Sequence, residues 1–225
     1  MSDSFNPFQQ YGFIAIEGSI GSGKTTLSKM MAERFPCTLV LEQFTDNPFL
    51  PFFYQQPERY AFPVELFFMT ERHKQLQEHF AKPSLFTSNT VADYFFLKTL
   101  LFAKNNLNEE EFRLFQRLFG VLNGTFPKPS LLVYLHRPVE VLLAQIKERG
   151  REMEQNISGT YLGEIQDAYL DFFRTEKELP ILVLELGAAD FLRDSQAFQA
   201  ILEVSSRTYR PGVHYRRLNG HLFSE

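Results

Sequence analysis

The sequence predicts an α/β fold in which a five-stranded parallel sheet is flanked by helices. Two observations carry this prediction. Short apolar runs alternate along the chain with segments whose apolar residues recur at helical spacing. One of these runs, Ser130–Leu135, is almost wholly apolar, as expected of a strand covered on both faces. The 225 residues suffice for one such domain with a sizeable core, so we expect residues 1–225 to form a single domain.

The first strand and helix enclose a glycine-rich loop. Phe13–Ile16 is the apolar run before the loop. The helix after it carries one apolar stripe, made of Leu27, Met30, Met31 and Phe35. Between them the chain fits G-x-x-x-x-G-K-[ST], with Gly18, Gly23, Lys24 and Thr25 at the fixed positions. The motif makes the predicted fold a three-layer sandwich of the P-loop NTPase type.

This loop has the residue types that a nucleoside triphosphate site needs. Glycines permit turns that point successive N–H groups inward, and the helix N-terminus adds partial positive charge. Lys24 can reach the β- and γ-phosphates, and the Thr25 hydroxyl can ligate Mg²⁺. The flanking strand and helix disfavour the alternative, a merely flexible glycine turn. The expected ATP-binding residues are Gly18, Ser19, Gly21, Ser22, Gly23, Lys24, Thr25 and Thr26.

The remaining elements follow in order along the chain. Strands are predicted at Thr38–Leu41, Phe86–Ala92, Ser130–Leu135 and Ile181–Leu184, with the second of the five, Thr38–Leu41, expected to be buried. Helices are predicted over Pro63–Phe80, Tyr94–Lys104, Glu109–Leu122, from Pro138 to the charged run 147–152, and over Tyr161–Arg174 and Asp194–Ser206. Residues 47–60 mix proline with aromatic residues, which indicates short helical turns, and we expect the basic tail 207–225 to be only partly ordered.

The composition excludes several classes of function. A net charge of −4 disfavours a general nucleic-acid surface, which would carry a basic stripe. The one cysteine, Cys37, excludes an internal disulfide and fits a reducing compartment. The polar first residues lack the apolar core of a signal peptide, and no apolar run approaches membrane-spanning length. We therefore expect a cytoplasmic protein that binds neither nucleic acid nor membrane.

Two carboxylates follow predicted strands. Glu42 comes just after Thr38–Leu41, and Asp93 just after Phe86–Ala92. The carboxyl ends of parallel strands gather at one edge of the sheet, so both side chains can point at the γ-phosphate. One carboxylate could then orient an attacking hydroxyl while the other, with Thr25, holds Mg²⁺. The alternative for each is a helix cap or a solvated charge.

Two arginines lie past a predicted helix end. Arg149 and Arg151 fall on a segment, about 147–160, that could close as a lid over the triphosphate. There they would neutralise the charge that develops during phosphoryl transfer. The alternative is an exposed helix terminus whose basic residues complement the helix dipole.

Together these residues resemble the deoxynucleoside kinase family, the P-loop kinases of nucleoside salvage, and among them the bacterial members that act on purine deoxynucleosides. The resemblance covers the chain from about Phe13 to Phe191. The matching pieces are the loop with its preceding Glu17, Glu42, Tyr54, Pro57–Phe62, Glu65 with Arg72, Phe102-Ala103, Arg149–Arg151 with Glu154-Gln155, and Asp190-Phe191.

The resemblance implies roles on the side of the phosphate acceptor. Glu42 would be the general base that holds the sugar 5′-hydroxyl as this group attacks the γ-phosphate. Tyr54 and Glu154 would grip the 3′-hydroxyl, and Phe102 would stack on the base. Together with the loop, these roles imply a pocket that places a deoxynucleoside beside the triphosphate.

On the donor side the resemblance implies that Phe191 packs near the adenine of ATP and that Arg149 and Arg151 are lid arginines. The chain departs from the family after the third strand, where relatives commonly carry Glu-Arg-Ser. Here Asp93-Tyr94-Phe95 follows. Asp93 can replace the acidic function with a shorter reach, whereas Tyr94 cannot replace the arginine's charge, so we expect the lid arginines to supply more of it.

Glu65 and Arg72 bear on the choice of base. Glu65 stands where many relatives have a base-reading glutamine, and Arg72 resembles its neighbour in that pocket. An ionised glutamate only accepts hydrogen bonds, so Glu65 favours the N–H groups of adenine, guanine or cytosine over thymine. We therefore expect a purine. A helical ion pair between the two residues is the alternative.

The expected reaction transfers the γ-phosphate of ATP, with Mg²⁺, to the 5′-hydroxyl of deoxyadenosine or deoxyguanosine. The resemblance further implies a homodimer whose interface uses the helices around 63–80 and 94–122. Two alternatives remain. One is a nucleoside monophosphate kinase similar to thymidylate kinase, which the carboxylate of Glu42 disfavours. The other is a nucleotide-binding subunit without catalysis, which the intact Lys24, Thr25, Glu42 and Asp93 disfavour.

Overall fold

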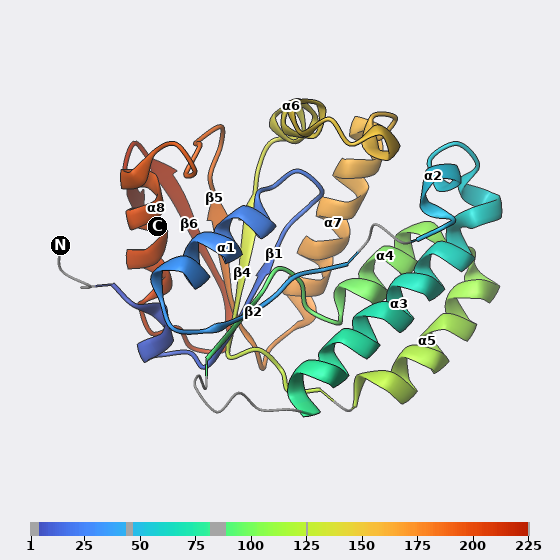
Figure 1. Cartoon of the computed structure of the whole chain (residues 1–225), viewed down its shortest axis with the longest axis horizontal. Coiled ribbons are helices and arrows are strands. Elements are labelled where there is room, and N and C mark those ends of the chain that lie inside the picture. The colour runs from blue at the N-terminus through green and yellow to red at the C-terminus, as the bar shows by residue number, and fades with distance from the viewer. Residues whose placement is uncertain (1–4, 44–46, 82–88, 125, 225) are drawn as a thin grey trace.

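The computed structural model describes residues 5–43, 47–81, 89–124 and 126–224, and a seven-stranded sheet forms its centre (Figure 1). The strand order is β2-β3-β1-β4-β5-β6-β7, and only the pair β6–β7 is antiparallel. The strands are β1 (Phe13–Glu17), β2 (Thr38–Val40), β3 (Thr90–Ala92), β4 (Leu131–His136), β5 (Pro180–Glu185), β6 (Gly212–Asn219) and β7 (Leu222–Ser224). The helices are α1 (Lys24–Arg34), α2 (Leu50–Phe53), α3 (Pro57–Ala81), α4 (Lys98–Asn106), α5 (Glu109–Asn123), α6 (Val139–Arg149), α7 (Gly159–Thr175) and α8 (Ser195–Ser205).

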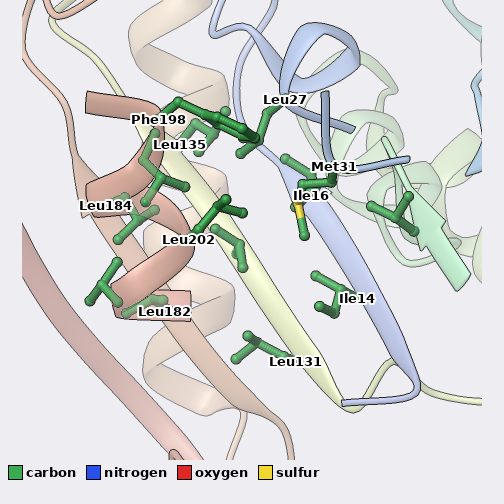
Figure 2. Close-up of a cluster of buried hydrophobic side chains, with 14 of the residues drawn as sticks. Ile14, Ile16, Leu27, Met31, Leu131, Leu135, Leu182, Leu184, Phe198 and Leu202 are labelled. Carbon is green, nitrogen blue, oxygen red and sulfur yellow. The ribbon is translucent and has the colours of Figure 1, made fainter. Parts of the chain in front are cut away.

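Helices cover both faces of the sheet because the central strands are apolar on both sides. In β4, Leu131 and Leu135 belong to the cluster that packs against α1 and α8 (Figure 2). The alternate positions, Leu132 and Tyr134, belong to the opposite cluster, which includes Tyr169 of α7. This alternation follows from the two-residue period of a strand.

The sheet brings the predicted site residues to one edge. Val40 pairs with Ala92, so β2 and β3 end side by side, and Glu42 and Asp93 follow these two ends. β1 lies next to β3 and runs into the glycine-rich loop. The phosphate loop and both carboxylates therefore meet at the carboxyl ends of three neighbouring strands.

The predicted fold class is confirmed, with a correction at the C-terminal end. Residues expected to be partly ordered instead form β6 and β7, which extend the predicted five strands to seven. β6 pairs with β5 from Gly212 to Arg217, and side chains along it alternate between half-buried and exposed. The segment is polar because one face of the strand meets solvent. It therefore lacks the apolar run by which the other strands are predicted from the sequence.

Three other elements differ from prediction. α3 begins at Pro57 and contains Pro63, because Pro57 suits the first helical turn and the chain accommodates the second proline inside the helix. β2 is an edge strand and is only half-buried at Thr38 and Leu39. α4 begins at Lys98 rather than at residue 94. The third predicted strand is confirmed over Thr90–Ala92, and its predicted first residues, 86–88, lie outside the described residues.

Among the residues that the structure describes, no helix is both long enough and apolar enough to cross a bilayer.

Candidate active site

The glycine-rich loop has a backbone that only glycine adopts readily at two fixed positions. Gly18 has φ +149° and Gly23 has φ +98°. A Cβ on Gly18 would meet the Leu135 carbonyl oxygen at 2.8 Å, and one on Gly23 would meet Phe191 Cζ at 2.8 Å. Gly23 directly precedes the first turn of α1. The loop therefore keeps its main chain open toward the helix N-terminus, as phosphate binding requires.

Lys24 folds back over this loop. Its Nζ donates to the carbonyl oxygens of Gly18, at 2.8 Å, and Ser19, at 3.0 Å. Burial and the nearby ammonium of Lys98 lower the pKa of Lys24 to about 8. The negative charges of Glu17, Glu42 and Asp93 raise this pKa but do not offset the decrease. The lysine remains a cation at neutral pH, since its pKa lies above 7.

Asp93 joins the loop to Glu42. Its Oδ2 accepts a hydrogen bond from the Thr25 hydroxyl at 2.5 Å, and its Oδ1 accepts one from the main-chain N–H of Glu42 at 2.6 Å. Asp93 is buried. Thr25 and Asp93 thus present two oxygens of the kind that Mg²⁺ prefers, one from α1 and one from the end of β3.

Two cations hold the carboxylate of Glu42. Oε1 accepts from Arg72 Nε at 2.8 Å and Nη2 at 2.5 Å, and Oε2 accepts from Lys98 Nζ at 2.6 Å. Burial opposes ionisation of Glu42, but the charges of Lys98 and Arg72 outweigh it and hold the pKa well below the ordinary range. Arg72 also donates from Nη1 to Thr99 Oγ1 at 2.9 Å. Arg72 therefore pairs with Glu42 across the cleft, rather than with Glu65 along its own helix.

Glu65 lies farther from the loop and contacts α4. Its Oε1 accepts from Asn106 Nδ2 at 2.6 Å, and Asn106 Nδ2 also lies 3.3 Å from the Tyr161 hydroxyl. Oε2 is buried without a hydrogen-bond partner. Burial raises the pKa of Glu65 to about 7, although the charge of Arg72 and the hydrogen bond from Asn106 lower it. Near neutral pH this carboxyl can therefore both accept and donate a hydrogen bond.

The two predicted lid arginines meet a buried carboxylate. Arg149 donates to Glu154 Oε2, and Arg151 Nη1 donates to Glu154 Oε1 at 3.3 Å. Gly150, between the arginines, ends α6 in the left-handed conformation at φ +71°, which turns the chain after the helix. Both guanidinium groups are about two-thirds buried. The arginines therefore point into the fold rather than into solvent.

One cleft brings most of the predicted residues together. The space between its walls, open solvent at its mouth included, is about 770 Å³. Its lining includes Gly21, Lys24, Thr25, Glu42, Tyr54, Glu65, Arg72, Asp93, Phe102, Arg149, Arg151 and Glu154. The phosphate loop contributes Gly21, Lys24 and Thr25 to this lining, and α3 and α4 contribute Glu65 and Phe102. The cleft thus combines residues that can bind a phosphate group with an aromatic ring on which a flat ligand could stack.

A second cleft adjoins the outer side of the loop. It is lined by Gly21, Gly23, Thr26, Arg137, Gln145, Glu148, Arg149, Asp190, Phe191, Leu192 and Arg193. Phe191 lies here and does not line the first cleft. Ser19 and Ser22 are buried beneath the loop and line neither cleft.

Sequence reasoning missed two residues of these clefts, Arg137 and Lys98, and the hydrogen-bond partner of Glu65, Asn106. Arg137 is buried, donates to the carbonyl oxygens of Ser22 and Gly187 at 3.0 Å each, and lies over the Phe191 ring at 5.5 Å. Lys98 and Asn106 share a helix face with Phe102, since the three are spaced by four residues. That spacing was the available signal, because Phe102 was already assigned to the pocket.

Comparisons with known proteins agree with this geometry. A family model described as deoxynucleoside kinase matches residues 14–208. A deoxyguanosine kinase of Bacillus subtilis (strain 168) is 32% identical over 196 residues, covering 84% of this chain and 93% of the relative. A deoxyadenosine/deoxycytidine kinase of the same organism is 30% identical over 197 residues, covering 84% and 89%.

The fold also matches solved structures. A deoxyadenosine kinase from M. mycoides with bound dATP has a TM-score of 0.71 at 21% identity, covering 87% of this chain and 99% of that one. The same enzyme with the products dCMP and a flexible dCDP has a TM-score of 0.70 at 22% identity, covering 85% and 95%. At this identity the likeness speaks for the fold.

Proposed function

Since the chain belongs to the deoxynucleoside kinase family, we propose that it transfers the γ-phosphate of ATP to the 5′-hydroxyl of a purine deoxynucleoside. Membership in the family makes it an ATP-dependent deoxynucleoside kinase, and the purine acceptor and the residue roles are the proposal. The observation that carries it is the position of Glu42, which lines the same cleft as Lys24 and Thr25 and is joined to Thr25 through Asp93.

Glu42 is proposed as the base. The 5′-hydroxyl would donate to its carboxylate, which Arg72 orients through two hydrogen bonds. As the 5′-oxygen attacks the γ-phosphorus, the bond from that phosphorus to the bridging oxygen of ADP breaks, and the hydroxyl proton passes to Glu42. The low pKa of this carboxylate fits a role in aiming the hydroxyl, because phosphoryl transfer depends mostly on positioning and electrostatics.

The loop and the lid would bind the triphosphate. Lys24 has two carbonyl partners that a phosphate can replace, and the main-chain N–H groups at the start of α1 point toward an anion. Arg149 and Arg151 would exchange Glu154 for phosphate oxygens when the segment 147–160 closes. Tyr54 and Glu154 would then hold the sugar 3′-hydroxyl.

Thr25 and Asp93 fit a magnesium ion. Each offers a side-chain oxygen that can coordinate a metal, and Thr25 Oγ1 lies 2.5 Å from Asp93 Oδ2. Both residues line the cleft beside Lys24. Mg²⁺ bound there would neutralise charge on the β- and γ-phosphates. Asp93 also accepts a hydrogen bond from the main-chain N–H of Glu42. The side chain of Asp93 would therefore fix the position of the base relative to the metal ion.

Base choice is proposed to rest on Glu65 and Phe102. Glu65 Oε1 is fixed by Asn106, and Oε2 has no partner in the described part of the chain, so Oε2 is free to accept from an N–H of the base. Thymine, with a single ring N–H, fits this acceptor least well. Relatives named deoxyguanosine kinase and deoxyadenosine kinase support a purine, while the relative named deoxyadenosine/deoxycytidine kinase makes deoxycytidine the acceptor to compare with it.

We also propose a cytoplasmic homodimer acting in nucleotide salvage. α5 exposes Leu114, Leu118 and Val121, which lie on one stripe at helical spacing and have exposed fractions of 51%, 38% and 77%. This helix lies within the predicted interface region 94–122. The single thiol, Cys37, fits a reducing compartment.

The test is turnover of purified protein with ATP, Mg²⁺ and each common deoxynucleoside, with dTMP as a further acceptor. We expect the highest kcat/KM with deoxyadenosine or deoxyguanosine and the lowest among the nucleosides with thymidine. A preference for dTMP, or ATP binding without turnover on any acceptor, contradicts the proposal.

A further inference from the structure

Lys98 has no role in the mechanism above, yet its position in the fold is electrostatically unfavourable. It is the first residue of α4, and its side chain is 6% exposed. A cation at a helix N-terminus opposes the helix dipole, and a buried charge must recover its lost hydration. The compensating partner is Glu42, whose Oε2 lies 2.6 Å from Lys98 Nζ.

Glu42 meets two cations. Arg72 donates two hydrogen bonds to Oε1, and the charge of Lys98 lowers the pKa of Glu42 even more than that of Arg72 does. Lys98 also interacts electrostatically with the buried carboxylates of Glu17 and Glu65. Because Arg72 stays bound to Oε1, an oxygen of an incoming phosphate could replace Oε2 as the partner of the Lys98 ammonium.

The charge of Lys98 also acts on the phosphate loop. Lys98 acts electrostatically on Lys24, where it is the largest charge lowering the pKa after burial, and on Glu17 at the end of β1. Lys98, Lys24 and Thr25 line one cleft with Glu42. The ammonium thus contacts the carboxylate proposed as base and lines the same cleft as the loop that would hold the triphosphate.

The residue after Asp93 supplies no charge here. Tyr94 is fully buried, and its hydroxyl donates to Gln75 Oε1 at 2.7 Å, in the core beneath α3. It does not line the cleft. The sequence predicted that the lid arginines make up for this missing charge, but Lys98 contacts Glu42 directly, whereas Arg149 and Arg151 pair with Glu154.

We propose that Lys98 is a catalytic residue whose ammonium passes from Glu42 to the oxygens of the transferred γ-phosphoryl group. This inference rests on the proposed function. A bond forms between the 5′-oxygen and the γ-phosphorus, and the bond to the bridging oxygen breaks with its electron pair retained by ADP. The hydroxyl proton goes to Glu42. Lys98 keeps its protons throughout and stabilises the charge on the phosphoryl oxygens.

The exchange of partners has a second effect. While Lys98 contacts Glu42, the carboxylate is a weak base. Once the ammonium of Lys98 binds the triphosphate, Arg72 is the one described cation still hydrogen-bonded to Glu42, and the carboxylate becomes more basic. The base is therefore strengthened when the phosphate donor is in place.

The experiment compares charge and length at this position. Wild type is first assayed with ATP and each common deoxynucleoside, and the best acceptor is used for all variants. In Lys98→Gln we expect kcat to fall about 100-fold or more, because a donor to the transition state has lost its charge. The KM for the deoxynucleoside should stay within about threefold, since ground-state binding is unaffected. Lys98→Arg, which keeps the charge, should retain kcat within about tenfold.

Two controls separate catalysis from structure. Lys104→Gln, an exposed site on the same helix, should match wild type in kcat and melting temperature. Lys98→Ala should regain activity in a saturable manner with added ethylammonium, which a residue needed only for packing would not show. The proposal is overturned if Lys98→Gln keeps kcat within about threefold of wild type, or if ethylammonium restores nothing to a folded Lys98→Ala protein. If wild type phosphorylates no deoxynucleoside, the proposed function itself fails.

Discussion

The main-chain N–H of Glu42 donates to Asp93 Oδ1 at 2.6 Å, so the residue after β3 fixes the backbone of the residue proposed as base. The other oxygen of Asp93 accepts from Thr25. Asp93→Asn would turn an amide N–H toward one of these two donors. We expect the Mg²⁺ concentration for half-maximal rate to rise about 10- to 100-fold. A magnesium titration at saturating ATP measures this, and an unchanged titration would remove Asp93 from the metal site.

Glu42→Gln tests the base. The amide keeps the shape of the side chain but neither takes the hydroxyl proton nor balances Arg72 and Lys98. We expect kcat to fall about 10²- to 10⁴-fold. The melting temperature should also fall, because two buried cations lose their counter-ion. Glu110→Gln, an exposed carboxylate on α5, is the control and should change neither value. Full activity in Glu42→Gln would contradict the assigned role.

Glu65 makes stability depend on pH. Its pKa is about 7 in the folded protein and 4.5 in the ordinary state, so folding favours the protonated form. The stabilisation is complete below pH 4.5 and is lost as the pH rises through 7, where ionisation of the buried group opposes folding. Relative to Glu65→Gln, the wild type should therefore lose about 2–3 kcal/mol of unfolding free energy between pH 5 and 8. Urea unfolding of both proteins measures this difference, and parallel pH profiles would refute it.

Gly23→Ala tests the loop. The position has φ +98°, and a Cβ would meet Phe191 Cζ at 2.8 Å. Backbone strain of about 1–3 kcal/mol should raise the Kd for ATP about 10- to 100-fold, because the loop must shift. Calorimetric titration with ATP measures the change. Gly120→Ala, in the middle of α5 with open space around it, is the control and should leave Kd unchanged while slightly raising stability.

The dimer proposal rests on the apolar stripe of α5. The double substitution Leu118→Lys and Val121→Lys would place two charges on this stripe beside Leu114. We expect the protein to become a monomer in light scattering while its helical content stays the same. A matched pair on an exposed flank of the same helix away from the stripe, Glu109→Lys with Gln116→Lys, should leave the mass unchanged. Equal masses for the two double variants would place the interface elsewhere.

Local patterns predicted much of this structure. The glycine loop, its strand and its helix follow from spacing and backbone chemistry alone. Glu42 and Asp93 could be placed because strand ends share one edge of a parallel sheet. β6 could not be predicted, since its stability depends on pairing with β5 and its own composition is polar.

The contacts within the cleft were less predictable. Arg72 was expected to serve the base pocket, but it pairs with Glu42, which lies thirty positions away in the chain. Lys98 was missed because, although it lay inside a predicted helix, its contact with Glu42 depends on how that helix packs against the strand ends. Such pairings depend on how α3 and α4 pack against the strand ends. A single sequence carries no direct record of that packing.

The placement of β6 has a consequence for how the polypeptide matures. Until residues 212–219 have been synthesised, β5 has a partner on one side only, and its other side presents unpaired main-chain groups. An unfinished chain would therefore expose a strand edge that can pair with another chain, so aggregation is favoured until β6 has been added.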